Sequence, residues 1–509
     1  MDSKVRVRFA PSPTGGLHLG GVRTVLFNYL FAKHHKGDFI LRIEDTDQSR
    51  FVPGAEQYIQ DTLAWCGLIP DESPLHGGPY GPYRQSERKA IYAQYAQKLI
   101  EQGNAYYAFD TPTDLEAKRK EIPNFQYSRA YRMEMKNSIS LSAAEVDALL
   151  KNNTPHVIRI KVPDNEEVSF EDVIRGQVNF DTSEVDDKVL LKADGMPTYH
   201  LAVVVDDHLM KITHAFRGEE WLPSAPVHIL LWKFLFGLDQ MPKWAHLPLI
   251  LKPDGNGKLS KRDGERLGFP VFAMDWTDPN TKETTIGFKE RGFLPEAFVN
   301  LLALLGWNDG TDKEIYTMDE LIAGFSLDRV HKGGAKFDYE KAKWFNAEWI
   351  KKTDDEKLAP LVKPYFDKAN IEIHDPNYLV KIIGLVKERC HLLPDFVTQS
   401  SFFFTAPTKI DTASIAPKWD SKKQEFFDEL SKSYSNQIAA GVLTLPAVVL
   451  ENEFKTLATK HELKPGELML PFRIMLVGGK FGPGVFEIVE SIELKDTVAR
   501  IKNCLQLLS

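Results

Sequence analysis

The stretch that decides the fold lies near the N-terminus and reads VRVRFAPSPTGGLHLGG over residues 5–21. Residues 5–9 alternate apolar and basic side chains as a strand does, and the prolines and glycines of 11–16 prevent continuation as strand or helix. Apolar residues then recur at helical spacing over 22–30, and a short strand of buried type follows at 39–43. This order predicts one βαβ unit of a parallel sheet, and with it a doubly wound domain.

The pattern changes twice further along the chain. Residues 110–188 combine a polar helix with β-rich segments, as an inserted α+β module would. The strand-like composition of 189–192 and 199–205 predicts that the parallel sheet resumes there. Nearly every segment after the glycine-rich loop 253–268 has helical periodicity, so we expect the C-terminal third to be helical.

The composition is that of a globular multidomain protein. The chain has 509 residues, 26% charged and 43% hydrophobic, with a net charge of −8. These values give no support to a disordered or fibrous protein, and they do not exclude a basic face that binds nucleic acid. Only three cysteines occur, far apart in the sequence, so neither a disulfide framework nor a structural zinc site is expected. Without an apolar signal region or a long apolar run, we expect a cytoplasmic protein that does not enter a membrane.

The first motif that carries chemistry is GLHLGG at residues 16–21, between the predicted strand and helix. Backbone amides at a helix start favour negatively charged ligands, so this turn has the outline of a phosphate site around His18. It is neither the G-x-G-x-x-G dinucleotide fingerprint nor a P-loop. Taken alone, it fits an ordinary glycine-rich turn with a hydrogen-bonded histidine equally well.

The second motif is GNGKLSKRDG at residues 255–264, a flexible loop with the cations Lys258, Lys261 and Arg262. By itself such a cluster is more often a solvated basic loop. A phosphate-accepting helix start together with a remote Lys-Ser-Lys loop is nevertheless what is needed to bend ATP and to stabilise charge as a carboxylate attacks its α-phosphorus. The two motifs together predict an ATP-using enzyme.

Both motifs resemble those of class I aminoacyl-tRNA synthetases. Residues 18–21, His-Leu-Gly-Gly, stand in place of that family's His-Ile-Gly-His, and residues 258–262, Lys-Leu-Ser-Lys-Arg, in place of Lys-Met-Ser-Lys-Ser. Further segments are similar, one by one and in the same order, to bacterial-type glutamyl-tRNA synthetases. These segments are RFAPSPTG (8–15), RIEDTD (42–47), GPYRQSER (81–88), PTYHLA (197–202), VDDH (205–208) and GPGVFE (482–487).

The resemblance implies a multidomain α/β plus all-α chain. A class I Rossmann-like catalytic domain is expected to be interrupted by an α+β acceptor-stem-binding module and followed by an α-helical anticodon-binding domain. The implied ranges are 1–109 and 189–252 for the two halves of the catalytic domain, 110–188 for the module, 253–329 for the Lys-Ser-Lys loop and stem-contact region, and 330–509 for the anticodon-binding domain.

In the resembling enzymes, matching positions bind glutamate and ATP. Glutamate carries two carboxylates and an ammonium, and a guanidinium pairs with carboxylate better than lysine does. The implied glutamate pocket consists of Arg8, Ala10, Ser12, Glu44, Tyr199 and Arg217. The implied ATP site consists of His18, Gly20, Glu219, Trp221, Lys258 and Lys261, of which His18 and the two lysines are catalytic. Mg²⁺ is expected to share the pyrophosphate charge, without a metal site formed by the protein, and no covalent enzyme intermediate is required.

Two regions depart from patterns found in the family, and a third contains the residue that matches an anticodon-reading arginine. Val203 stands where the resembling enzymes often have an asparagine that contacts the substrate, so one polar contact is missing or supplied elsewhere. Residues 106–109 and 126–132, where some members carry a zinc site, have none of the needed ligands, so no zinc is expected. Arg389 matches an anticodon-reading arginine, whereas the nearby Phe402 to Phe404 are expected to fill a helix–helix core.

The expected function is ATP-dependent ligation of L-glutamate to tRNA-Glu through a glutamyl-adenylate, by a monomer. The helical pattern from residue 330 onward disfavours a small nucleotidyltransferase, and also a glutaminyl-tRNA synthetase, whose C-terminal part is β-barrel. A non-catalytic tRNA-binding paralogue is disfavoured because Lys258 and Lys261 are present. The sequence leaves open whether tRNA-Gln is also charged.

Overall fold

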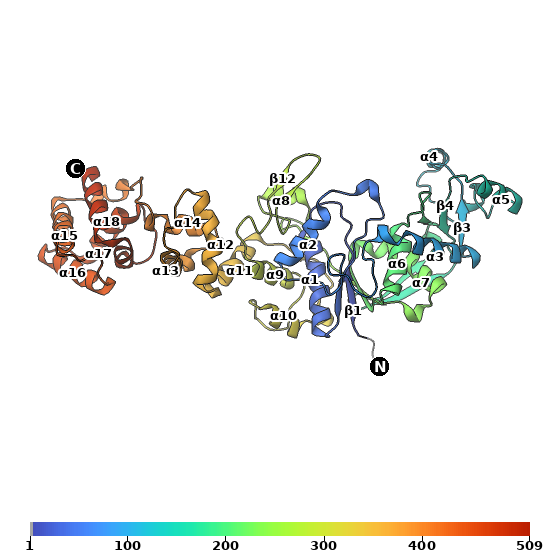
Figure 1. The fold of residues 1–509 in the computed structure, drawn as a ribbon, viewed down its shortest axis with the longest axis horizontal. Helices are drawn as coiled ribbons and strands as arrows, with labels where there is room; N and C mark the ends of the chain where they lie inside the picture. The colour runs from blue at the N-terminus through green and yellow to red at the C-terminus, as the bar shows by residue number, and fades with distance from the viewer. Residues whose placement is uncertain (1–3, 509) are drawn as a thin grey trace. The chain divides into compact units, whose positions relative to one another are not determined.

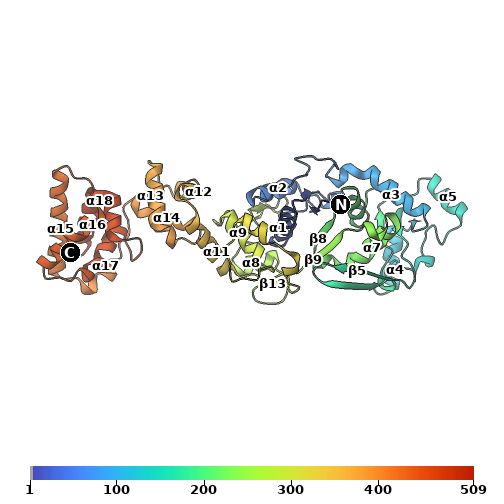
Figure 2. The same cartoon turned by 90° about the horizontal axis from the view of Figure 1, so that it is seen from below.

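The structure is a computed structural model that describes residues 4–508, and the chain divides into two compact units. The first unit comprises the chain up to residue 290 together with 295–342, and the second comprises 291–294 together with the chain from 343 onward. Figure 1 and Figure 2 show the sheet-containing first unit in blue to yellow and the helical second unit in orange and red. Within residues 4–508, no helix has both the length and the apolar character needed to cross a membrane.

A six-stranded sheet forms the centre of the first unit. Its order is β2-β1-β8-β9-β5-β6, and every neighbouring pair is parallel except β5 and β6. The strands are β1 (Arg6–Phe9), β2 (Asp38–Leu41), β5 (Glu167–Asp172), β6 (Gly176–Asp181), β8 (His214–Gly218) and β9 (Lys243–Leu247). The predicted βαβ unit is confirmed, because α1 (Leu19–His34) connects the parallel strands β1 and β2.

Strand β1 marks the place where the strand order reverses. One neighbour, β2, follows it directly in the chain, and the other, β8, comes much later. In open α/β sheets, ligands bind in the crevice beyond the carboxyl ends of the strands at such a reversal. The sheet therefore places a binding crevice beyond β1, where the Pro-Ser-Pro-Thr-Gly turn lies.

The helices of the first unit pack around this sheet. Helix α1 packs against β1, β2 and β8 and also against α9 and α10, whereas α3, α6 and α7 pack on one another, and α7 packs on β5. These helices are α2 (Ala55–Trp65), α3 (Lys89–Glu101), α6 (Tyr199–Leu209), α7 (Ala225–Leu235), α8 (Lys261–Leu267), α9 (Pro295–Leu304) and α10 (Met318–Gly324). Two small ladders complete the unit, a parallel one of β10 (Ile250–Leu251) with β13 (Ala335–Lys336) and an antiparallel one of β11 (Trp276–Thr277) with β12 (Thr284–Thr285).

The prediction of a strand at 199–205 is wrong, because this segment opens helix α6. Its valines favour a strand by propensity, but residues 201–207 are all buried. A helix that is buried on all sides shows the same continuous apolar run as a buried strand, so periodicity does not separate the two. The helical form places Tyr199 and Asp207 on one element beside the crevice.

A separate antiparallel sheet forms the inserted region. It has the order β3-β4-β7, with β3 (Ala105–Ala108), β4 (Val157–Ile160) and β7 (Val189–Leu191), and it is accompanied by α4 (Pro112–Glu121) and α5 (Ala143–Lys151). The parallel sheet thus does not resume at 189–192 as predicted, because β7 pairs with β4. The β5–β6 hairpin, conversely, extends the main sheet. The domain limits at 110 and 188 stay a prediction.

A buried carboxylate joins the two segments in which some resembling enzymes carry zinc. Asp187 accepts a hydrogen bond from the Tyr106 hydroxyl at 2.6 Å and from Arg132 at 2.7 Å and 2.8 Å. The Arg132 guanidinium also donates to the carbonyl of Val162. In this chain, hydrogen bonds to one aspartate therefore hold residues 106–109 and 126–132 together.

The second unit is helical, which confirms the expectation for the C-terminal third. Its helices are α12 (Asp355–Lys368), α13 (Pro376–Val386), α14 (Asp395–Ser400), α15 (Ser421–Ala439), α16 (Ala447–Lys460), α17 (Pro465–Val477) and α18 (Val485–Leu508), while α11 (Tyr339–Lys352) spans the division between the units. Helix α18 packs against α15, α16 and α17 around stacked rings of Phe454 and Phe472. Phe402 and Phe403 are buried, as predicted for core residues.

Candidate active site

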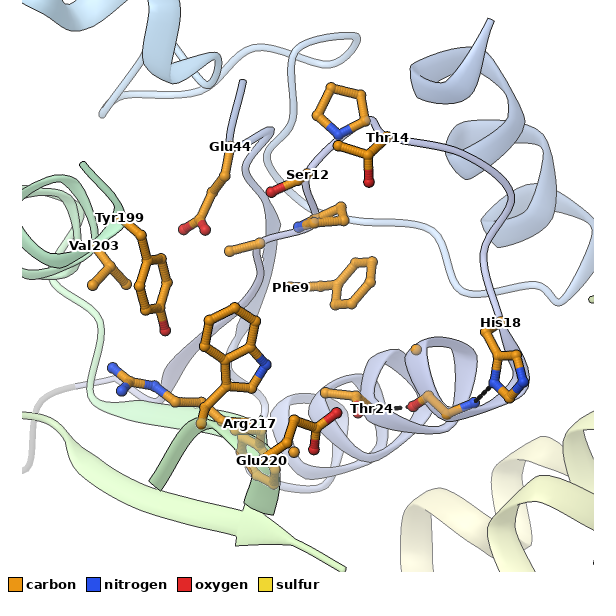
Figure 3. Close-up of a pocket in the computed structure, with 18 of the residues that line it drawn as sticks. Phe9, Ser12, Thr14, His18, Thr24, Glu44, Tyr199, Val203, Arg217 and Glu220 are labelled. Atoms are coloured by element: carbon orange, nitrogen blue, oxygen red, sulfur yellow. Dashed lines mark hydrogen bonds between the residues drawn. The ribbon is translucent and has the colours of Figure 1, made fainter. Parts of the chain in front are cut away.

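A cavity of about 970 Å³ lies at the carboxyl ends of β1, β2 and β8, where the strand order reverses. This volume is at the upper end of what small-molecule sites occupy. Figure 3 shows Glu44, Tyr199 and Arg217 on one side of the cavity and His18 on the other. Most of the predicted site residues line it, namely Arg8, Ala10, Ser12, His18, Gly20, Glu44, Tyr199, Arg217, Trp221 and Lys258.

Two predicted residues, Glu219 and Lys261, are not among those that line the cavity. The Glu219 carboxylate forms an ion pair with Arg175 and accepts a hydrogen bond from the backbone N–H of Leu249 at 3.0 Å. Lys261 opens helix α8 and lies 3.5 Å from the carboxylate of Glu265 one turn further on. Both side chains are thus engaged beside the cavity, and their roles stay predictions.

His18 caps the N-terminus of α1 and lines the cavity. Its Nδ1 accepts a hydrogen bond from the Gly20 N–H at 3.3 Å. Burial, helped by the Lys258 ammonium, lowers the pKa of His18 to about 4, so the ring is neutral and carries its proton on Nε2. That nitrogen is buried and has no hydrogen-bond partner among residues 4–508. His18 therefore offers an unused N–H donor at the positive end of the α1 dipole, where the first-turn amides already donate within the protein.

Gly20 leaves room for a ligand at the same place. A Cβ atom built on Gly20 would meet only Nδ1 of His18, at 3.9 Å. A side-chain Cβ atom at position 20 would therefore not clash with the described protein atoms, so packing within the protein does not explain the glycine. Because the positive end of the α1 dipole and a neutral histidine donor lie beside this open space, the turn suits the close approach of a phosphate.

The basic loop reaches the cavity through Lys258. Its ammonium lies 2.6 Å from the carboxylate of Glu220, which also lines the cavity. At the start of α8, the Asp263 carboxylate accepts hydrogen bonds from the Ser260 hydroxyl at 2.5 Å and from the Ser260 N–H at 3.0 Å. Lys258 thus already has an acidic partner, from which it must separate to contact a phosphate.

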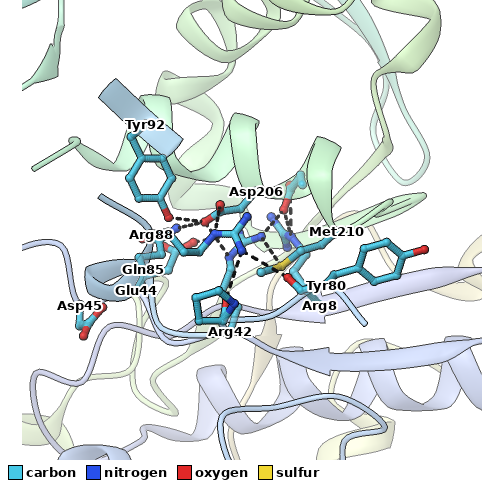
Figure 4. Close-up of polar contacts among 12 residues, drawn as sticks. Arg8, Arg42, Glu44, Asp45, Tyr80, Gln85, Arg88, Tyr92, Asp206 and Met210 are labelled. Carbon is cyan, nitrogen blue, oxygen red and sulfur yellow. Dashed lines mark hydrogen bonds and ion pairs between the residues drawn. The ribbon is translucent and has the colours of Figure 1, made fainter. Parts of the chain in front are cut away.

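A buried charge network supports the other side of the cavity. The carboxylate of Asp207 lies 3.0 Å from Arg8 and 2.9 Å from Arg42, and Arg42 also lies 3.1 Å from Glu44 (Figure 4). Burial opposes ionisation of Asp207, but Arg8 and Arg42 outweigh it and lower its pKa. Burial raises the pKa of Glu44. The sheet and α6 thus hold Arg8 rigidly at the cavity wall.

A second carboxylate anchors the back of this network. Asp206 accepts hydrogen bonds from Arg88 at 2.8 Å, Tyr92 at 2.8 Å and Gln85 at 2.9 Å (Figure 4). Asp206 and Asp207 lie in the VDDH segment on which the resemblance rests, yet the sequence assigned neither a role. Two adjacent acidic residues in an otherwise apolar segment indicate buried carboxylates. Because buried charges are paired, this pattern was the signal in the sequence for a charge network.

Arg217 lies outside that network. Its Nη1 donates to Nδ1 of His228 at 2.9 Å, and its guanidinium lies 4.7 Å from the ring centroid of Trp244. Burial lowers the pKa of Arg217, and its Nε has no hydrogen-bond partner in the described part of the chain. Val203 adds an apolar wall to the cavity, so it supplies no polar contact.

In the second unit, Arg389 ends a short 3₁₀ turn, Lys387–Arg389, and is exposed. Its guanidinium makes one long contact of 3.5 Å with the carbonyl of Leu385. Its positive charge also contributes to a lowered pKa of Arg473, after burial of that residue. An exposed arginine with a second arginine nearby suits contact with RNA, and its role stays a prediction.

Comparison with known proteins decides the family. Residues 4–344 match the catalytic domain of class I tRNA synthetases (E and Q), and residues 357–505 match an anticodon binding domain. The glutamate–tRNA ligase of Phocaeicola vulgatus is 51% identical over 512 residues, which cover 100% of this chain and 99% of the relative. The chain belongs to the glutamate–tRNA ligase family. A second ligase of this family, from Christiangramia forsetii, is 50% identical over all of both chains.

Solved structures of glutamate–tRNA ligases agree with this assignment. The crystal structure of the ligase from Elizabethkingia meningosepticum, in complex with its amino acid, has 48% sequence identity and a TM-score of 0.94 and covers 100% of both chains. The structure from Elizabethkingia anophelis has 47% identity and a TM-score of 0.90 and covers 99% of this chain and 100% of the other. The predicted family, class I catalytic domain and helical anticodon-binding domain are confirmed. The individual site residues stay predictions.

Proposed function

We propose that this ligase activates L-glutamate with ATP in the cavity and then esterifies the 3′-terminal ribose of tRNA-Glu. The observation that carries the proposal is that one cavity joins a phosphate-accepting helix start at His18 to the buried guanidinium of Arg217. The first supports an anionic nucleotide and the second supports a carboxylate.

In the first step, an α-carboxylate oxygen of glutamate attacks the α-phosphorus of ATP. The new P–O bond forms as the bond to the β-phosphate breaks, and pyrophosphate leaves with that electron pair. The positive end of the α1 dipole and the Nε2–H of His18 would stabilise the phosphates. Lys258, released from Glu220, and Lys261 would hold the charge that develops on pyrophosphate.

In the second step, a ribose hydroxyl of the tRNA attacks the carbonyl carbon of glutamyl-adenylate. The ester bond forms, AMP leaves with the electron pair of the C–O bond, and the hydroxyl proton is lost to solvent. No nucleophilic side chain is required, since the nucleophile comes from tRNA.

The same geometry assigns the ends of glutamate. Its α-carboxylate must reach the α-phosphorus, so the α-carboxylate would lie toward His18 and the side-chain carboxylate toward Arg217 and Tyr199 (Figure 3). Arg8, Ala10, Ser12 and Glu44 would complete the pocket, with Glu44 toward the ammonium. The guanidiniums of Arg8 and Arg217 would attract the two carboxylates of glutamate.

Mg²⁺ would enter with ATP as part of the substrate. Among residues 4–508, no group of three or more His, Cys, Asp or Glu side chains is arranged to hold a metal. Mg²⁺ binds mainly through water and substrate phosphates, so the phosphates of ATP would be its main ligands. We propose no zinc requirement, and we propose that the enzyme works as a cytoplasmic monomer with tRNA-Glu as its macromolecular partner.

The test is glutamate-dependent ATP–pyrophosphate exchange, measured with tRNA-Glu present, for the wild type and Arg217→Lys. We expect exchange with glutamate and a KM for glutamate raised about ten- to a hundred-fold in the variant, because lysine loses the bidentate geometry. The KM for ATP serves as the internal control and should stay within about two-fold. No glutamate-dependent exchange by the wild type would sink the proposal.

A further inference from the structure

Arg217 differs from the buried arginines Arg8 and Arg42 in what holds it. Arg8 and Arg42 share the carboxylate of Asp207. No carboxylate of the described residues lies within ion-pair distance of Arg217, and its hydrogen-bonded partner is instead an imidazole nitrogen of His228 at 2.9 Å. The charge of Arg217 is thus buried without a counter-ion in direct contact, because Asp207 and Glu44 act on it only from beyond ion-pair distance. Such a charge is costly to bury unless a ligand supplies a partner.

The protonation of His228 follows from this contact. A guanidinium has no acceptor, so Nδ1 of His228 must be unprotonated where it meets Arg217. The neutral ring then carries its proton on Nε2, which faces Nδ1 of His200 at 3.1 Å. Nδ1 of His200 therefore accepts this hydrogen bond. The two hydrogen bonds, from Arg217 to His228 and from His228 to His200, together fix the tautomers of both histidine rings.

The surroundings keep this pair neutral. Burial and the neighbouring Arg217 hold the pKa of His228 well below its usual range, and burial together with Lys188 lowers the pKa of His200 to about 4. His228 is completely buried. Its ring also packs edge-on against Tyr199, with centroids 5.1 Å apart. His228 therefore contacts both Arg217 and Tyr199, the two residues proposed to meet the substrate side chain.

We propose that His228, backed by His200, positions Arg217 without itself supplying a counter-ion, so that the pocket selects a side-chain carboxylate over an amide. A carboxylate at the place of His228 would hold the guanidinium equally well but would neutralise it. A neutral acceptor fixes the direction of the guanidinium and leaves its charge for the substrate. The inference rests on the proposed function, in which Arg217 meets the glutamate side chain.

The first test uses a matched pair of variants, His228→Asn and His228→Asp. Both place an oxygen acceptor near the position of Nδ1, and they differ in charge. His228→Asn should keep the KM for glutamate within about three-fold. His228→Asp should raise it about ten- to a hundred-fold, as expected for the loss of one charge-assisted interaction, and should reduce the preference for glutamate over glutamine by a similar factor.

A third variant, His228→Leu, removes the acceptor and should also raise the KM for glutamate about ten- to a hundred-fold. In all three, kcat at saturating glutamate and the KM for ATP should change far less, which separates positioning from general damage to the fold. An unchanged KM for glutamate in folded His228→Asp and His228→Leu would overturn the inference, as would a KM for ATP raised equally.

The second test does not depend on activity. In the wild-type chain labelled with ¹⁵N-histidine, several rings should have an unprotonated Nδ1 and a protonated Nε2, and the signals of one of them should disappear in His228→Asn. A ring of His228 protonated on Nδ1, or on both nitrogens, would overturn the inference even if the enzyme charges tRNA. Conversely, wild-type enzyme that fails to charge glutamate would remove the proposed function, whereas the tautomer of His228 would be decided independently.

Discussion

Arg8 in β1 and Asp207 in α6 form a buried ion pair, with Nε and Oδ1 3.0 Å apart. The pair connects the strand that precedes the Pro-Ser-Pro-Thr-Gly turn to the helix that carries Tyr199. The cavity wall is therefore held by an interaction between residues about two hundred positions apart.

Asp207→Asn should strongly destabilise the first unit. The substitution leaves Arg8 and Arg42 buried without their shared carboxylate, and breaking a buried pair costs about 3–5 kcal/mol. We expect a lower midpoint of thermal unfolding and a raised KM for glutamate in the fraction that folds. As a matched control, Glu116→Gln breaks an exposed pair with Lys120 and should change stability by less than about 1 kcal/mol. Equal effects of the two variants would contradict the account.

Lys258→Ala and Lys261→Ala should each lower kcat for pyrophosphate exchange. Groups that stabilise charge developing in the transition state typically contribute about 10²- to 10³-fold each. The KM for glutamate should change little, because neither lysine belongs to the glutamate pocket. Lys289→Ala, at an exposed position after the loop, is the control and should retain full exchange. Full activity in Lys261→Ala would show that this residue does not act on the pyrophosphate.

Glu220→Gln should ease the binding of ATP. Lys258 must leave the carboxylate of Glu220, 2.6 Å away, before it contacts a phosphate. The pair is partly exposed, and such pairs contribute at most about 1 kcal/mol, so we expect the KM for ATP to fall by no more than about five-fold. Steady-state kinetics with varied ATP measures this. A rise in the KM for ATP would mean that Glu220 itself supports nucleotide binding.

Stability should fall as the pH falls from about 6.5 to 4, in part through His200. Burial, with Lys188, lowers the pKa of His200 in the folded protein to about 4 from its ordinary 6.5. The unfolded chain therefore binds a proton in this window that the folded chain does not, and acid favours unfolding. His200→Gln should reduce the loss of unfolding free energy between pH 7 and 4.5 by about 2 kcal/mol. Urea unfolding at the two pH values measures it, and identical losses in variant and wild type would contradict the assignment.

The sequence predicts the first βαβ unit because its local signals agree with one another. Alternation over 5–9, prolines and glycines at 11–16 and helical spacing over 22–30 all require the same strand, turn and helix. The segment 199–205 is predicted wrongly for the opposite reason. Its valines favour a strand, but its burial on all sides is a tertiary property that the local pattern does not contain.

The site residues also divide into those that the sequence can predict and those that it cannot. Residues in continuous motifs, such as His18 and Lys258, can be named from the sequence, and both line the cavity. His228 lies in an apolar run that predicts only a buried helix, so nothing in the sequence marks its contact with Arg217. Glu220 and Glu219 are adjacent acids, and only the fold decides that Glu220 lines the cavity while Glu219 pairs with Arg175.

The most direct measurement of the central claim is aminoacylation of purified tRNA-Glu and tRNA-Gln with labelled glutamate, ATP and Mg²⁺. The account predicts a glutamyl ester on tRNA-Glu and one AMP released for each ester formed, and the tRNA-Gln arm decides whether that tRNA is a second acceptor. The Arg217→Lys variant should charge tRNA-Glu only when the glutamate concentration is raised. Absence of glutamyl transfer to either tRNA by folded wild-type enzyme would contradict the account.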